Sequence, residues 1–349
     1  MSNSINWQNV NRVLVVRLRS IGDTVLSTPS LIALRRLLPN AQIDILLEDW
    51  VAPLLEGFEE ADNVLRVSRD PKARLRIARE LRKQKYDVAF NLHGGTTATF
   101  FVRASGAVHR VGYSNYSYSF LYTHLLSSSS EFWGKEKTHS AEQQLALLGF
   151  VGVPVRDRPK THLNITDKAS RSIEEKLDAV VSTGRSKLAL IHPVAAFETK
   201  QWATENFAKI AEFLSEKGFQ VAAAATKKER EVLTRLKEMS KARIITFDDL
   251  TLPEISALAS RSRIFVGNDS GIAHIAAAVK TPSVVIFGSS NRDHWRPWTD
   301  TPNEIVYEEF SCQPCPGYVC EKFGKPKCIL SVSVKQVESA VDRVLKYEH

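Results

Sequence analysis

The fold is constrained most by two apolar runs. Each run passes through small polar residues into a helix-forming segment. Residues 263–279, RIFVGNDSGIAHIAAAV, have a buried-strand pattern that reaches a polar turn and continues as an alanine-rich helix. Residues 11–38 repeat this order, because NRVLVVRL runs into the turn RSIGDTVLSTP and then into an amphipathic helix that Pro39 ends. Strands that alternate with helices in this way predict parallel sheets covered by helices.

The alternation continues along the whole chain and is interrupted once. Residues 151–167, VGVPVRDRPKTHLNITD, are rich in proline and polar side chains, as a domain linker is. We therefore expect an α/β protein with two Rossmann-like, doubly wound domains, residues 1–165 and 166–349, that face one another across a cleft. We expect segment 114–130 to be irregular and a helix over 333–347 to close the second domain.

The length and composition agree with two soluble globular domains. The chain has 349 residues, of which 43% are hydrophobic and 25% are charged. No run of 18 apolar residues occurs, and the N-terminal MSNSINWQNV is polar and lacks the apolar segment of a secretory signal. We expect a cytoplasmic protein.

The net charge of +8 is concentrated in the first domain, and residues 66–85 carry nine of its bases against two acids. Motifs and interleaved aromatic residues typical of nucleic-acid binding are missing, so we expect no nucleic-acid partner. An acidic substrate and a membrane surface rich in phosphate fit the patch equally well. A solvated helix face remains the plain alternative.

All four cysteines lie in one short segment, residues 312–328. Cys312 and Cys315 have the spacing of metal ligands, but a second such pair is absent, and Cys320 and Cys328 would have to complete the site. Reduced structural thiols are the alternative to a metal site, and we expect no metal.

The two polar turns are candidates for ligand binding. A helix that begins near Ser270 and Gly271 presents free backbone N–H groups that attract phosphate, and Asp269 beside it suits sugar hydroxyls. His274 lies one helical turn further on and could face the same ligand or pack in the core. Asp23, in the first turn, could accept a proton from a hydroxyl or serve only as a helix N-terminal charge.

Three segments together resemble glycosyltransferase family 9, the ADP-heptose:lipopolysaccharide heptosyltransferases. They are RLRSIGDTVLSTPSL at 17–31, HPVAAFETKQWATENFAKI at 192–210 and VGNDSGIAHIAAA at 266–278, in the order and with the spacing of the family. The cysteine-rich tail is similar to that of heptosyltransferase III-like members. The resemblance implies the GT-B fold, with the acceptor in the first domain and the nucleotide sugar in the second.

The resemblance also implies roles for residues of the second domain. Lys200 matches the lysine that binds the donor diphosphate, and Asp269 matches the acid that contacts the transferred heptose. The amides of Ser270 and Gly271 match the phosphate-binding turn, and Glu229 falls where the family has a carboxylate on the ribose. The family commonly has glycine and hydroxyl residues after the His-Pro pair, whereas residues 194–197 read VAAF here.

In the first domain, Asp23 matches the proposed catalytic base that deprotonates the acceptor. Arg17 and Arg19 border the same site and could neutralise acceptor charges, and His93 is a further acceptor-site candidate.

The resemblance therefore implies an inverting transferase that needs no metal or cofactor. Its donor would be ADP-L-glycero-D-manno-heptose and its acceptor a lipopolysaccharide inner-core sugar, with peripheral association at the cytoplasmic face of the inner membrane. Three alternatives stay open: another nucleotide sugar, a protein acceptor as in autotransporter heptosyltransferases, and a non-catalytic nucleotide-sugar-binding protein.

Overall fold

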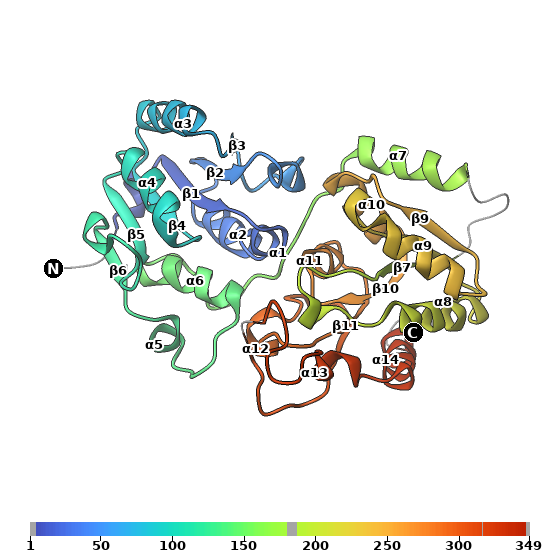
Figure 1. Ribbon diagram of the computed structural model, residues 1–349. Coiled ribbons are helices and arrows are strands. Elements are labelled where there is room, and N and C mark those ends of the chain that lie inside the picture. Colours follow the sequence, from blue (N-terminus) through green and yellow to red (C-terminus); the bar gives the residue numbers. More distant parts are fainter. Residues whose placement is uncertain (1–4, 180–186, 316, 347–349) are drawn as a thin grey trace. The chain divides into compact units, whose positions relative to one another are not determined.

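The chain divides into two compact units, Met1–Asn164 and Ile165–His349, and each is built on one parallel sheet (Figure 1). The computed structural model describes residues 5–179, 187–315 and 317–346. The first four residues of the polar N-terminus and Tyr347, the last residue of the expected C-terminal helix, lie outside the described residues.

Unit 1 contains a six-stranded sheet in the order β3-β2-β1-β4-β5-β6, and all its strand pairs are parallel. Its strands are β1 (Arg12–Leu18), β2 (Gln42–Glu48), β3 (Asn63–Val67), β4 (Val88–Asn91), β5 (His109–Tyr113) and β6 (His124–Leu126). Its α-helices are α1 (Ile21–Val25), α2 (Thr28–Leu37), α3 (Pro71–Lys83), α4 (Gly95–Ala104), α5 (Ser129–Trp133) and α6 (Ser140–Phe150). Short 3₁₀ turns are η1 (Trp7–Asn9), η2 (Ala52–Leu55) and η3 (Ser119–Leu121).

Both faces of this sheet are buried, which is why β1 reads as a continuous apolar run. Leu14 and Val16 pack in one core with Phe101 of α4 and Leu81 of α3. The alternate residue Val15 is also fully buried and points to the opposite face, because side chains alternate along a strand. Helices α2 and α6 contact each other, as α3 and α4 do, so each pair forms one helical layer.

Unit 2 repeats the architecture with the strand order β12-β11-β10-β7-β8-β9, again parallel throughout. Its strands are β7 (Leu188–His192), β8 (Gln220–Ala224), β9 (Ile244–Phe247), β10 (Ser262–Asn268), β11 (Ser283–Ile286) and β12 (Asn303–Val306). Its helices are α7 (Asp167–Asp178), α8 (Thr204–Glu216), α9 (Arg230–Met239), α10 (Leu252–Arg261), α11 (Gly271–Ala278), α12 (Arg292–Trp295), α13 (Lys327–Leu330) and α14 (Val334–Lys346), with 3₁₀ turns η4 (Glu198–Lys200) and η5 (Lys227–Glu229).

Helix α14 covers β11 and β12 and packs on α8. Val337, Val341 and Val344 are fully buried in the same core as Ile286 of β11, and their spacing puts them on one face of the helix. Helices α7 and α11 contact α10, and together the three form the other layer. None of the helices in the described parts of the chain combines the length and apolar character needed to cross a lipid bilayer.

Several elements differ from the sequence-based expectation. The segment 114–130, expected to be irregular, contains β6, a three-residue edge strand that pairs with β5. The turn before α2 is itself a short helix, α1, because Ser20 and Asp23 form a capping box at its start. Helix α7 follows the linker directly, and β12 is a further edge strand. The sequence did not predict α7 because it is strongly charged, or β12 because it is short, and both therefore have a weak apolar pattern.

Candidate functional site

The acidic side chain of the second polar turn, Asp269, directly follows β10 and is buried. Its backbone N–H donates to the Ile286 carbonyl of the neighbouring strand at 3.0 Å, which fixes the turn to the sheet. One carboxylate oxygen, Oδ2, lies 2.9 Å from Lys200 Nζ and also accepts a hydrogen bond from the Ser290 hydroxyl. The turn therefore holds a carboxylate and an ammonium group side by side.

Lys200 stands in η4, in the loop that follows β7, and its neighbours hold this loop in place. The Gln201 amide donates to the Pro193 carbonyl at 2.7 Å and accepts from the Ala195 N–H at 2.8 Å. Trp202 is fully buried, and its backbone N–H donates to the Asn268 side chain at 3.1 Å. The loop whose sequence VAAF lacks hydroxyl groups is thus organised by the glutamine that follows the lysine.

The loop after β11 connects the lysine to the acid, and the sequence did not single it out. The Ser289 hydroxyl donates to Thr199 Oγ1 at 2.9 Å, and the Ser289 N–H donates to the Thr199 carbonyl at 3.2 Å. A Cβ at Gly288 would overlap that carbonyl oxygen, so this position requires glycine. The next residue, Ser290, binds Asp269. The only sequence signal was a Gly-Ser-Ser at the end of an apolar run.

These residues lie at the point where the strand order of the sheet reverses. In unit 2 the chain moves outward from β7 in one direction and from β10 in the other, and Lys200 and Asp269 follow those two strands. Open parallel sheets bind ligands outside the carboxyl ends of the strands at such a switch point. The position agrees with a ligand site for a group that carries negative charge and hydroxyls.

The remaining donor-site candidates lie on neighbouring elements. Ser270 is the N-cap of α11 and Gly271 its first residue; among the described residues the Ser270 hydroxyl has no hydrogen-bond partner. His274 is buried within α11. Glu229 ends η5, and its carboxylate accepts from the Thr226 N–H at 3.0 Å and from the Thr226 hydroxyl at 2.7 Å. The Glu229 carboxylate therefore caps its own turn in this structure.

Unit 1 has a comparable arrangement at the end of β1. The Asp23 carboxylate in α1 forms an ion pair with Arg17 and accepts a hydrogen bond from the Ser20 hydroxyl at 2.9 Å. Arg17 is buried and also donates to the Leu92 carbonyl, which follows β4. Since the strand order of this sheet reverses between β1 and β4, this pair too lies at a switch point.

His93 follows β4 and joins the same cluster. Burial lowers the pKa of its imidazole, the nearby Arg17 and Arg19 lower it further, and the nearby Asp23 raises it. The ring also contacts the backbone of Arg19. The structure therefore brings together all four candidates of the first domain, with an imidazole of lowered pKa beside the Arg17–Asp23 ion pair.

The four cysteines are present as free thiols. Cys312, Cys315 and Cys320 line one pocket, and Cys328 is buried in α13. Within the described ranges, no three His, Cys, Asp or Glu side chains are arranged to hold a metal ion. The cysteine segment lies against η4, where Thr199 donates to the Gly317 carbonyl, and against the loop after β11, where the Ser289 carbonyl accepts from the Cys315 N–H at 3.0 Å.

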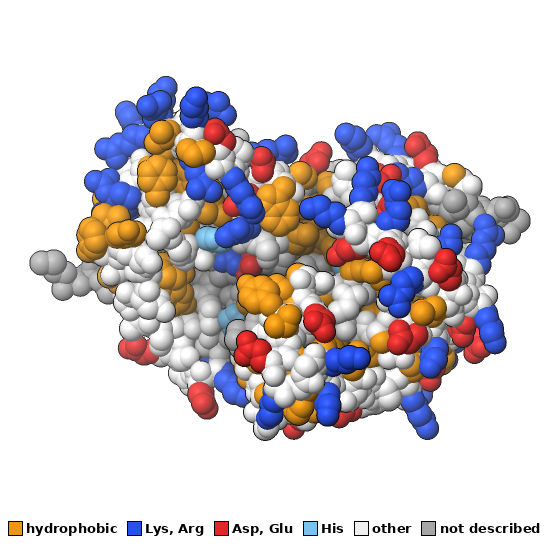
Figure 2. Space-filling model, viewed as in Figure 1, with side chains coloured by type: hydrophobic (Ala, Val, Ile, Leu, Met, Phe, Trp, Pro, Cys, Tyr) orange, Lys and Arg blue, Asp and Glu red, His pale blue; other side chains and the backbone are white. Residues whose placement is uncertain are grey.

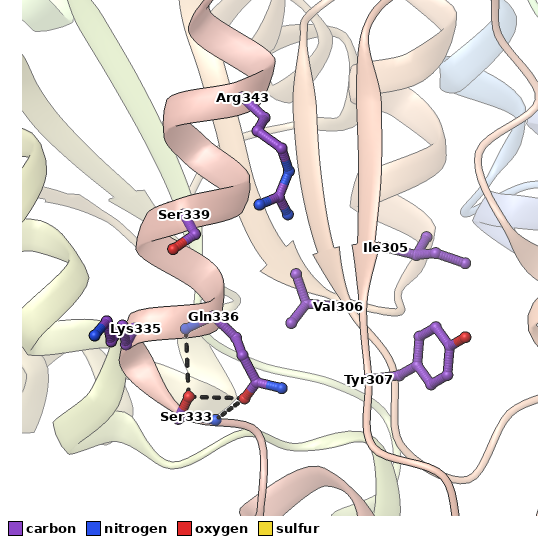
Figure 3. Close-up of a pocket in the computed structure, with 8 residues that line it drawn as sticks. All are labelled: Ile305, Val306, Tyr307, Ser333, Lys335, Gln336, Ser339 and Arg343. Carbon is purple, nitrogen blue, oxygen red and sulfur yellow. Dashed lines mark hydrogen bonds between the residues drawn. The ribbon is translucent and has the colours of Figure 1, made fainter.

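Another pocket of unit 2 lies between β12 and α14 and contains none of the residues predicted from the sequence (Figure 3). Arg343 is held there by Glu304 at 2.6 Å. At the start of α14 the Ser333 N–H and hydroxyl each donate to the Gln336 side chain at 2.7 Å. The start of this helix is therefore capped by its own residues.

Comparison with known proteins identifies one family that this chain resembles along most of its length. Residues 74–324 match the family model of glycosyltransferase family 9 (heptosyltransferase). Lipopolysaccharide heptosyltransferase 3 of Escherichia coli K12 is 27% identical over 302 residues, 81% of this chain and 84% of that protein. Lipooligosaccharide heptosyltransferase 2 of Campylobacter jejuni (strain NCTC 11168) is 25% identical over 337 residues, 94% of this chain and 97% of that protein.

Solved structures share the fold along almost the whole chain. A family 9 glycosyltransferase from Veillonella parvula superposes with a TM-score of 0.86 at 19% identity, covering 99% of this chain and 100% of that one. The ADP-heptose lipopolysaccharide heptosyltransferase II of E. coli gives 0.79 at 20% identity, covering 97% and 99%. The expected α/β class with two Rossmann-like sheets, as in GT-B enzymes, is confirmed. The chain belongs to glycosyltransferase family 9, the heptosyltransferases, and is a glycosyltransferase.

Proposed function

We propose that the protein transfers L-glycero-D-manno-heptose from ADP-heptose to a sugar of the lipopolysaccharide inner core, with inversion at the anomeric carbon. Its membership of family 9 and its similarity to lipopolysaccharide heptosyltransferase 3 of E. coli support this proposal. An E. coli heptosyltransferase of the same fold has been solved with ADP-2-deoxy-2-fluoro heptose, with a TM-score of 0.68. In this proposal unit 1 binds the acceptor and unit 2 binds the donor.

The observation that carries the donor assignment is the contact between Lys200 and Asp269 beside the start of α11. A diphosphate needs positive charge, which Lys200 and the free N–H groups at the helix N-terminus would supply. The unpartnered Ser270 hydroxyl would donate to the same anion. Asp269 would then contact heptose hydroxyls. On donor binding, Lys200 would exchange the carboxylate for phosphate while Ser290 keeps hold of Asp269.

On the acceptor side, Asp23 would accept the proton of the attacking hydroxyl. The geometry supports this role because Arg17 and Ser20 hold the carboxylate in one orientation. Arg17 and Arg19 would also attract phosphates or carboxylates of the acceptor, with His93 close to both arginines. The leaving ADP would be stabilised electrostatically by Lys200 and the amides of α11, without a metal ion.

Incubation of the purified protein with ADP-heptose and core oligosaccharide from a strain that lacks its gene tests the proposal. The acceptor should gain one heptose by mass spectrometry, and nuclear magnetic resonance should show the anomeric configuration inverted relative to the donor. Transfer from another nucleotide sugar, or heptose found on a protein instead, would contradict it.

A further inference from the structure

Tyr318 is an exposed aromatic side chain that packs against the loop that carries Lys200. Among the described residues of unit 2, it has the highest exposed fraction of any large hydrophobic side chain, 71%. Figure 2 shows hydrophobic side chains lying among charged ones on the surface of unit 2. The Tyr318 ring contacts the half-buried ring of Phe197 edge to face, with 4.5 Å between the ring centroids. The two rings therefore form a fixed aromatic pair of which one member is open to a ligand.

Phe197 places this pair beside the candidate donor site. The Lys200 ammonium nitrogen lies 5.6 Å from the centroid of the Phe197 ring and 2.9 Å from Asp269 Oδ2. Phe197 also ends the run VAAF at 194–197, whose side chains offer no hydroxyl group to a ligand. The loop after β7 therefore presents an apolar surface next to the charged pair.

Hydrogen bonds hold the segment that carries Tyr318 in place. The Thr199 hydroxyl donates to the Gly317 carbonyl, and the Cys315 N–H donates to the Ser289 carbonyl at 3.0 Å. A Cβ at Gly317 would lie only 3.2 Å from the Thr199 side chain, so the two segments approach each other closely. The segment is thus attached both to the loop after β7 and to the loop after β11.

The order of the strands indicates which part of a nucleotide sugar would reach the aromatic pair. Lys200 and Asp269 follow the central strands β7 and β10, and Glu229, the ribose candidate, follows β8 on one side of them. The segment that carries Tyr318 is bound to the loop after β11, on the other side. A donor with its ribose near β8 and its diphosphate at Lys200 therefore directs its sugar, and not its adenine base, toward Tyr318.

We propose that Phe197 and Tyr318 form an aromatic subsite for the sugar ring that the enzyme transfers, an inference that rests on the proposed function. A pyranose has faces lined by C–H bonds, which the negative face of an aromatic ring attracts. Contact between the rings and such a face also removes apolar surface from water. Lys200 and Asp269 hold the phosphate and hydroxyl groups of the donor, and the aromatic pair holds the apolar face of its sugar. Tyr318 therefore sets specificity for the sugar and not for the nucleotide.

Calorimetric titration with ADP-heptose and with ADP, both without acceptor, tests this subsite. Tyr318→Ala should raise the Kd for ADP-heptose about fivefold, because part of one ring face is no longer buried by the sugar. The same variant should leave the Kd for ADP unchanged. Tyr318→Phe keeps the ring and should bind both ligands as the wild type does. The matched control is Phe323→Ala, which removes another exposed ring whose aromatic contact is with Phe310, and it should change neither Kd.

Four results would overturn the proposal. An equal rise of both Kd values in Tyr318→Ala would indicate a contact with the nucleotide or a displaced loop. Unchanged Kd values for both ligands, with or without a higher KM for the acceptor, would remove the ring from the donor site. An equal loss in Tyr318→Phe would assign the contact to the hydroxyl group. A wild-type protein that binds ADP-heptose no more tightly than ADP, and transfers no heptose, would contradict the donor itself before any variant is compared.

Discussion

The ion pair between Lys200 and Asp269 leads to an unusual prediction: removing the charge of a donor-site acid should strengthen the binding of ADP. In the free protein Asp269 Oδ2 lies 2.9 Å from the ammonium group that the donor diphosphate would need. The carboxylate and the diphosphate therefore compete for the same cation. We expect Asp269→Asn to bind ADP more tightly than the wild type while transferring heptose more slowly, since free ADP has no sugar for Asp269 to contact.

The structure allows the size of these effects to be estimated. A hydrogen bond to a charged group contributes about 1.5–3 kcal/mol, so Lys200→Ala should raise the Kd for ADP roughly 10- to 150-fold. Removing the competing carboxylate should strengthen ADP binding by about 1 kcal/mol, or about fivefold, because Lys200 is partly exposed and water screens the pair. In Lys200→Ala the buried carboxylate keeps, among the described side chains, the Ser290 hydroxyl, so the double variant Lys200→Ala/Asp269→Asn should recover part of the lost affinity.

Isothermal titration calorimetry with ADP and steady-state kinetics with ADP-heptose separate the two effects. Lys209→Ala, which removes an exposed lysine of α8 in the same unit, should change neither measurement. Thermal unfolding of each variant checks that the fold is retained. If Asp269→Asn binds ADP more weakly than the wild type, Asp269 and the diphosphate do not compete for Lys200. If Lys200→Ala leaves both Kd and KM unchanged, Lys200 is not part of the donor site.

Other predictions concern chemistry, positioning and pH. Asp23→Asn should fold and bind ADP-heptose but lose about 10²–10⁴-fold in kcat, whereas EDTA should leave wild-type turnover largely intact; near-normal turnover of the variant, or full inhibition by EDTA, would contradict the proposed mechanism. Ser290→Ala should lower kcat about tenfold and change the affinity for ADP little, because the hydroxyl that holds Asp269 is lost. Ser290→Thr keeps a hydroxyl and should restore kcat; an equal loss of kcat in both variants would indicate that Ser290 has a packing role. Burial lowers the pKa of the His93, His124 and His192 imidazoles below 6.5 in the folded protein. On acidification these three side chains therefore bind protons more readily in the unfolded chain than in the folded one. The free energy of unfolding should therefore fall as the pH drops below about 6.5, and urea denaturation of the wild type and His93→Gln at two pH values would check this.

The fold was predictable because parallel sheets bury both faces of their strands. Continuous apolar runs such as 11–18 therefore mark strands, and the helices between them follow from amphipathic spacing. The edge strand β6 was missed because it has three residues and lies between polar segments. Helix α7 was missed because buried apolar side chains occur only at Ala169, Ile173 and Leu177 among many charges.

The sequence indicated individual residues of the candidate site but not the contacts among them. Lys200 and Asp269 are 69 positions apart, and nothing in their local patterns showed that they touch. Ser290 was missed because serines after a glycine are typical of ordinary loops. Glu229 was placed by resemblance, and the structure adds that its carboxylate caps η5 through Thr226. Contacts between loops that follow different strands depend on strand order, which local sequence does not contain.

The two acid–base pairs differ in a way that follows from the chemistry of arginine and lysine. Arg17 is buried and binds the Leu92 carbonyl as well as Asp23, so its planar guanidinium is fixed by two partners. Lys200 is a point charge on a flexible stem, partly exposed, which forms an ion pair with Asp269 and lies 5.6 Å from the centre of the Phe197 ring. An arginine held in this way suits the orientation of a carboxylate that must stay in place through the reaction. A flexible lysine held by one ion pair and a ring contact can turn to a phosphate and back in each cycle, which is what a reversible donor site requires.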